Sequence, residues 1–133
     1  MSYSDIVKKS LGKDIVTISK QKGESFRAQH QEVDGEDLVW VDCLGETPYI
    51  KYEVFDQIEK AFSHYGETIE RGSAMDARLG EKKLPLDSIE GQIAVVYGYK
   101  IGDSVFRRVS PVCNILVWAG LCEHGNGILK KVN

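Results

Sequence analysis

The residues with the clearest chemical potential are two adjacent arginines, Arg107 and Arg108, in the C-terminal third of the chain. An arginine near the start of a helix can donate two hydrogen bonds to guanine, and its neighbour can meet a phosphate. The pair therefore predicts a contact with nucleic acid. The alternative interpretation is a pair of solvated charges on an amphipathic helix, one of them paired with Asp103.

No group of residues has the spacing of a catalytic or metal site. Cys122 and His124 are of metal-ligand type, but Cys-x-His is not a standard zinc spacing. Four carboxylates between residues 34 and 42, followed by Lys51, are similar in order to a metal-dependent nuclease, but Tyr49 occupies the position of its glutamate ligand. No serine, cysteine or threonine lies in a nucleophile motif. We therefore expect a protein that is not an enzyme and has neither a metal nor a cofactor.

Length and composition predict one ordinary core, alone or with an appended module. The chain has 133 residues, of which 42% are hydrophobic, and a formal charge of -3. Residues 87–133 carry +1 and the first 86 residues carry -4, which is a mild asymmetry. The three cysteines have no disulfide-framework spacing, and the sequence has neither an apolar N-terminal signal nor a long apolar run. We expect a cytoplasmic protein with no membrane partner.

The first 80 residues are predicted to form an antiparallel sheet with two helices. A short amphipathic helix over 2–11 precedes strands over 15–19, 26–33 and 38–43. Asp34-Gly35 predicts a tight hairpin, because both positions tolerate a positive φ. The apolar stripe over 49–65 predicts a longer helix that ends at Gly66 and covers a three-stranded sheet. Between Ser73 and Leu79 we expect a further short turn of helix.

A domain boundary is expected near 80–86, which gives residues 1–80 and 81–133, or else one continuous domain 1–133. After the boundary, Asp87 and Ser88 are candidate N-caps, and Glu90 completes a capping box for a helix that ends at Gly98. A second helix is predicted from Val105 to Trp118, which must kink or restart at Pro111, with Ser110 as a new cap. A glycine-cornered hairpin over 124–132 follows.

The C-terminal third resembles a winged helix-turn-helix DNA-binding domain. Residues 93–98, Ile-Ala-Val-Val-Tyr-Gly, are similar to the signature of the second helix in that family, and Gly125-Asn126-Gly127 is similar to its wing. The resemblance implies a small DNA-binding regulator whose recognition helix lies in the major groove of double-stranded DNA. The candidate nucleic-acid-binding residues are Lys100, Ser104, Arg107, Arg108, Asn114, Lys130 and Lys131.

Three alternatives remain open from the sequence. The β-branched and aromatic residues after residue 92 are also typical of an antiparallel meander, which would leave one α+β domain without a helix-turn-helix. The apolar run Ile115–Leu121 could bury itself against a partner, so the protein would be an interaction module or a homodimer without nucleic-acid binding. An enzyme of unrecognised type is the third alternative.

Overall fold

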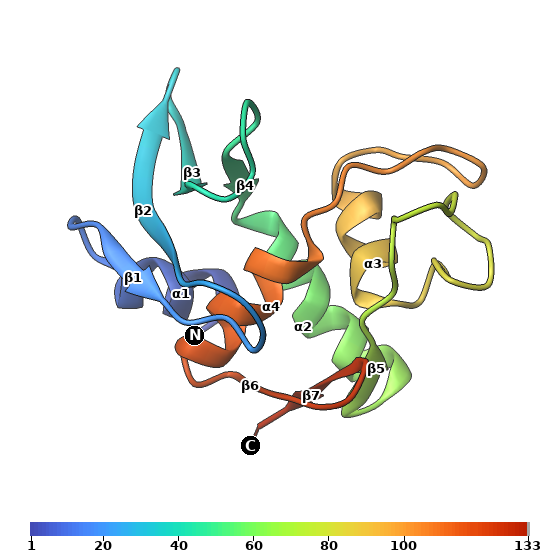
Figure 1. The fold of residues 1–133 in the computed structure, drawn as a ribbon. Coiled ribbons are helices and arrows are strands. Elements are labelled where there is room, and N and C mark those ends of the chain that lie inside the picture. Colours follow the sequence, from blue (N-terminus) through green and yellow to red (C-terminus); the bar gives the residue numbers. More distant parts are fainter. Residues whose placement is uncertain (133) are drawn as a thin grey trace.

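The structure is a computed structural model that describes residues 1–132, and it has an α+β fold (Figure 1). These residues form four α-helices and two antiparallel sheets, so the predicted α+β class is confirmed. The helices are α1 (Tyr3–Leu11), α2 (Glu53–Tyr65), α3 (Ile89–Val96) and α4 (Val109–Trp118). The strands are β1 (Val16–Ile18), β2 (Phe26–Val33), β3 (Glu36–Val41), β4 (Tyr49–Lys51), β5 (Thr68–Glu70), β6 (Cys122–His124) and β7 (Ile128–Lys131).

The first sheet has four strands in the order β1-β2-β3-β4, where three were predicted. The β2–β3 hairpin is confirmed, because Asp34 and Gly35 both have positive φ angles, of 51° and 80°. The additional strand β4 was predicted as the first turn of a helix. Ile50 is completely buried opposite Val39 while its neighbours are half-buried, so the backbone follows the two-residue period of a strand here.

Helix α2 is shorter than predicted and has a different neighbour. It begins at Glu53, after β4, and ends at Gly66 as expected. Its apolar stripe packs mainly against α1 and α3, and α1 is the helix that lies against β2. In Figure 1 α2 runs from β4 through the middle of the molecule toward β5, away from the rest of the first sheet, so the expected placement of this helix over that sheet is corrected.

The second sheet joins the middle of the chain to its C-terminal end. The predicted C-terminal hairpin is present as β6 and β7, but β5 pairs with the other edge of β7, in the order β5-β7-β6. The hairpin is therefore a part of this sheet and not a free wing. One hydrophobic cluster includes Phe55 and Ile58 of α2 together with Ile93 of α3 and Ile115 of α4.

Helix α3 begins and ends close to its predicted bounds. The Ser88 hydroxyl accepts a hydrogen bond from the Gly91 amide at 3.0 Å, and Gly98 has a φ of 80°. The predicted capping box is wrong, because Glu90 does not return to the helix cap. Its side chain is fully buried and binds the start of α4 instead.

Helix α4 begins at Val109, four residues after the predicted start. Pro111 lies in its first turn, where the backbone amide needs no helical partner. No helix precedes Val109, so the predicted restart at Pro111 is wrong, and Arg108 and not Ser110 is the N-cap. Seven of the ten residues of α4 are buried. The helix that was expected to enter a DNA groove is therefore a core helix.

Two long connections, residues 71–88 and 97–108, pack together beside α3, and we call them the loop lobe. They share a small apolar cluster of Leu79, Leu84, Ala94 and Val105. The expected turn of helix between Ser73 and Leu79 is not formed. The amide of Leu79 instead donates to the carbonyl of Asp103, which ties the two connections to each other.

Candidate functional site

The predicted contact residue Asn114 is buried and has a structural role. It is 2% exposed, its Oδ1 accepts the amide of Gln21 at 3.0 Å, and its Nδ2 donates to the carbonyl of Ser110 at 2.7 Å. These bonds fix the β1–β2 connection against α4. Asn114 cannot reach a nucleic acid, and this prediction is corrected.

Arg108 is also buried, at 8% exposed. Its guanidinium carbon lies 3.6 Å from the centre of the Tyr97 ring and 4.8 Å from the centre of the Phe106 ring. Nε and Nη1 have no hydrogen-bond partner among the described residues, so the two rings hold the cation in place. The predicted contact of this side chain with nucleic acid is therefore corrected.

Glu90 completes the surroundings of Arg108. Its carboxylate accepts the Arg108 amide at 3.0 Å and so satisfies the start of α4, whose N-cap residue supplies no side-chain bond. Burial raises the pKa of Glu90 to about 6, while the backbone amides of Arg108 and Val109 and the charges of Arg108 and Arg107 act in the opposite direction. The four residues Glu90, Tyr97, Phe106 and Arg108 thus connect α3 to α4.

The other predicted residues do not form one surface. Lys100 and Ser104 are exposed in the loop lobe, whereas Lys130 and Lys131 lie on β7. Figure 1 places the connection between α3 and α4 at the opposite end of the molecule from β7. One continuous contact by all seven residues is therefore not available.

Arg107 is exposed and lines a cavity of about 450 Å³. The cavity is formed where the β1–β2 and β3–β4 connections meet the start of α4. Two of its seven lining residues, Lys20 and Arg107, are cationic and none is acidic. Phe106, which is 38% exposed, is the aromatic residue of the lining. The complete lining is Lys20, Cys43, Leu44, Phe106, Arg107, Ser110 and Pro111.

Sequence reasoning identified Arg107 but missed Lys20 and Phe106. Lys20 lies far from Arg107 in the chain, in the β1–β2 connection that Asn114 holds against α4, whereas Phe106 directly precedes Arg107. The cavity also contains a cysteine thiol. Burial raises the pKa of Cys43, although Lys20 acts against this, so the thiol is protonated and a weak nucleophile at neutral pH. The arrangement can bind an anion but offers no activated nucleophile.

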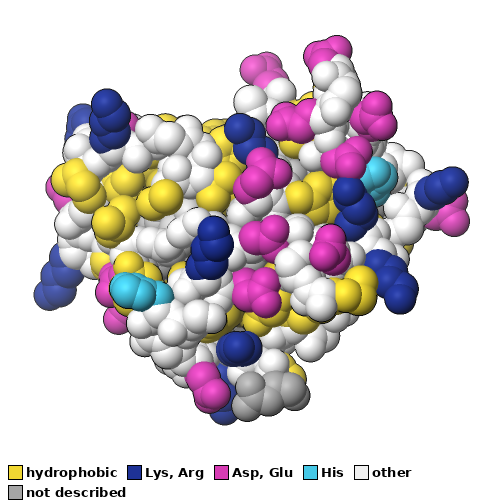
Figure 2. All heavy atoms as spheres, turned by 180° about the vertical axis from the view of Figure 1, so that it is seen from behind, with side chains coloured by type: hydrophobic (Ala, Val, Ile, Leu, Met, Phe, Trp, Pro, Cys, Tyr) yellow, Lys and Arg dark blue, Asp and Glu magenta, His cyan; other side chains and the backbone are white. Residues whose placement is uncertain are grey.

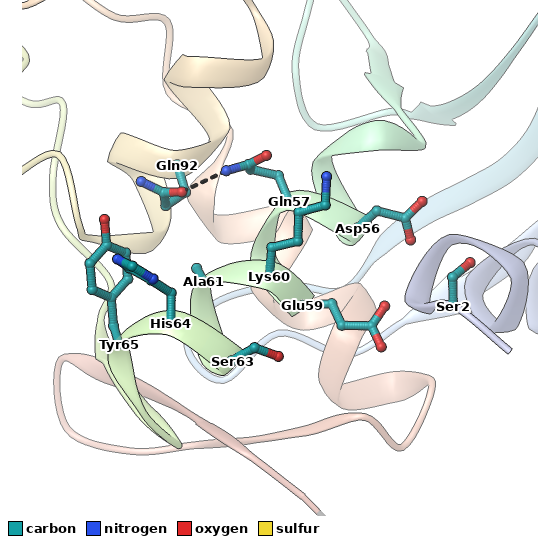
Figure 3. Close-up of a pocket in the computed structure, with 10 residues that line it drawn as sticks. All are labelled: Ser2, Asp56, Gln57, Glu59, Lys60, Ala61, Ser63, His64, Tyr65 and Gln92. Atoms are coloured by element: carbon teal, nitrogen blue, oxygen red, sulfur yellow. Dashed lines mark hydrogen bonds between the residues drawn. The ribbon is translucent and has the colours of Figure 1, made fainter.

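A larger hollow of about 840 Å³ follows α2 (Figure 3), and its carboxylates are already in use. Asp56 accepts the Ser4 amide and hydroxyl at 2.9 and 2.7 Å, and Glu59 accepts the Tyr3 amide at 3.0 Å. In Figure 3 Gln57 points toward Gln92, with which it shares a hydrogen bond of 2.8 Å. These groups join α1, α2 and α3, so the hollow has a structural explanation. Its lining is Ser2, Asp56, Gln57, Glu59, Lys60, Ala61, Ser63, His64, Tyr65 and Gln92.

One group of polar side chains, His30, Tyr52 and Asp37, has the residue types of acid–base catalysis. The Nδ1 of His30 lies 2.7 Å from the Tyr52 hydroxyl, and its Nε2 lies 3.7 Å from Asp37. Tyr52 is only 6% exposed, burial raises the pKa of its hydroxyl, and neither of the cavities described above includes these residues. These three residues thus lie outside both described cavities.

Three further findings bear on partners. No group of three potential metal ligands occurs among residues 1–132, and no helix in this range has the length and apolar character that crossing a bilayer requires. The apolar run Ile115–Leu121 is largely used inside the chain, since Ile115 and Leu116 are fully buried. No family model, curated protein or solved structure matches this sequence.

Proposed function

We propose that this protein is a non-enzymatic binding protein for nucleic acid, and that it binds a single strand through the cavity beside α4. The observation that carries the proposal is the convergence of Lys20 and Arg107 on a hollow without acidic residues, in a protein whose formal charge is -3. Cations in a concave site concentrate the local field and attract phosphate. An exposed ring beside them is typical of sites that take unpaired nucleotides.

The structure changes the form of nucleic acid that we favour. Duplex recognition through a major groove requires a helix with an exposed face, and α4 is buried along most of its length. A single strand needs only backbone contacts and a stacking surface. The proposal therefore keeps Arg107 from the sequence prediction and adds Lys20 and Phe106 to it.

Replacing Lys20 and Arg107 together by alanine should weaken the binding of a single-stranded oligonucleotide about tenfold or more at low salt. The loss of one charge-assisted hydrogen bond to phosphate, roughly 1.5–3 kcal/mol, already corresponds to a weakening of this size. The salt dependence should also decrease, by about 0.7 in the logarithmic slope for each phosphate contact removed. Fluorescence anisotropy at several salt concentrations measures both quantities.

The matched control is the double variant Lys100→Ala with Lys130→Ala, which removes two exposed lysines outside the cavity. We expect this control to bind nearly as the unaltered protein does. Equal weakening by both double variants would show diffuse attraction and contradict the cavity. The absence of any binding by the unaltered protein at low salt would contradict the function itself.

A second candidate function is self-association or binding of a protein partner through the loop lobe and α3. Figure 2 shows hydrophobic side chains gathered on the side of the molecule where α3 and its flanking connections lie. Three large hydrophobic residues of α3 and its flanking connections are exposed: Leu86 at 43%, Val95 at 42% and Ile101 at 66%. Large exposed apolar patches mark interaction sites.

For this second candidate, light scattering of the unaltered protein should show a mass that increases with concentration. Substituting Val95→Lys with Ile101→Lys should return the mass to that of a monomer, because two charges would be buried in the contact. Ile15→Lys, which alters an exposed residue outside the loop lobe, is the control and should leave association unchanged. A monomer at all concentrations would contradict self-association.

A further inference from the structure

The aromatic wall of the cavity belongs to a larger stack of planar groups. The Arg108 guanidinium lies over both the Tyr97 and the Phe106 rings, at 3.6 and 4.8 Å from their centres. Tyr97 is itself anchored, because its hydroxyl accepts the Lys51 amide of β4 at 3.0 Å. The stack therefore connects the first sheet to the wall of the cavity.

Burying an arginine in this way is costly, and the cost needs an explanation. Two guanidinium nitrogens of Arg108 have no acceptor among residues 1–132, although the side chain is more than nine-tenths buried. A buried donor without a partner is unfavourable, so such groups in a folded protein call for a specific reason. The Arg108 guanidinium contacts Phe106, which lines the cavity. This contact holds the Phe106 ring in one orientation.

Phe106 is the member of the stack that reaches the cavity. Phe106 is 38% exposed as a residue and lines the same hollow as Lys20 and Arg107. Arg108 contacts the Phe106 ring, but the residue remains accessible from the cavity, which leaves apolar surface there for another planar group. An oriented aromatic surface beside two cations matches a ligand that has a flat ring and a phosphate in close succession.

We propose that Phe106 is a stacking platform for one unpaired nucleobase, whose phosphate contacts Lys20 and Arg107. This inference rests on the proposed function and specifies the ligand as a nucleotide unit and not a phosphodiester backbone alone. Arg108 acts as a positioning residue, because it contacts the ring and not the ligand. Stacking accepts every base, so we expect weak sequence preference.

The test compares two strands of equal length and charge, an oligothymidylate and its abasic counterpart, by fluorescence anisotropy at low salt. The unaltered protein should bind the oligothymidylate about tenfold more tightly than the abasic strand. Phe106→Leu keeps an apolar side chain without the π-surface and should bind both strands equally. Phe106→Trp should restore the preference, and its indole emission should decrease when the base stacks.

The outcomes separate the two proposals. Equal binding of both strands by the unaltered protein, or a preference that persists in Phe106→Leu while circular dichroism shows a native fold, would overturn the stacking platform and leave nucleic-acid binding intact. Binding of neither strand would overturn both. Tighter binding of a phosphotyrosine peptide than of the oligothymidylate would show that the cavity takes a protein ligand and would also overturn the nucleotide assignment.

Discussion

Replacing Glu90 by alanine should lower the free energy of unfolding by about 3 kcal/mol at pH 7, one of the two largest effects that we expect. The carboxylate is fully buried and accepts the Arg108 amide at the start of α4. Its removal leaves that amide and a buried guanidinium without compensation. Urea denaturation followed by circular dichroism measures the change. Glu90→Gln retains a carbonyl acceptor and should lose much less.

The hydrogen bond that Glu90 accepts stabilises the folded protein, but ionisation of its buried carboxyl lowers the free energy of unfolding, and this second effect depends on pH. Burial raises the pKa of the folded protein's Glu90 from its ordinary 4.5 to about 6. Between these values the folded state binds more protons at Glu90 than the unfolded state, so the contribution of Glu90 to stability is greatest below pH 4.5 and is lost as the pH rises through 6. The loss amounts to about 2 kcal/mol.

Other groups contribute to the same pH curve, so the comparison with Glu90→Gln is essential. Burial lowers the pKa of His124, which adds stability as the pH rises, and the lowered pKa values of Asp37 and Asp42 act at more acidic pH. Subtracting the Glu90→Gln curve from that of the unaltered protein leaves the Glu90 contribution. A flat difference between pH 4.5 and 7 would contradict a raised pKa. A stable Glu90→Ala protein would contradict the capping role.

Local sequence signals predicted the elements whose causes are local. The Asp34-Gly35 hairpin follows from two positive φ angles, and the stripe that includes Phe55 and Ile58 places one face of α2 in the core. The pairing of β5 with β7 joins Ile69 to Leu129 and has no local signal, because its stabilisation depends on contacts that form only in the folded chain. The C-terminal hairpin was therefore predicted as a free wing, without β5 as its partner.

The candidate site was predicted only in part, for a similar reason. Arg107 and Arg108 are identical in type and adjacent, yet one lines the cavity and the other is buried against Tyr97. Both residues precede the first residue of α4, so their backbone is not helical. Helical spacing therefore does not predict where the two side chains lie. Lys20 enters the site because Asn114 binds its connection, which sequence periodicity does not report.

Gly91→Ala should destabilise the protein by about 2 kcal/mol or more, although alanine is favoured over glycine inside helices by about 1 kcal/mol. A Cβ at this position would overlap the Pro85 carbonyl oxygen and lie 2.6 Å from that of Leu86. The Pro85 carbonyl cannot withdraw freely, because the Ser88 amide and hydroxyl both donate to it. The clash therefore outweighs the propensity.

Thermal and urea unfolding of Gly91→Ala measure this difference, and Val95→Ala is the matched control on the same helix. Val95 is 42% exposed, so its truncation should change the free energy of unfolding by only about 0.5 kcal/mol. If Gly91→Ala were instead more stable than the unaltered protein, the intimate packing of α3 on residues 85 and 86 would be contradicted. The support that α3 gives to Glu90, and through it to the start of α4, depends on that packing, because Glu90 is the residue directly before Gly91.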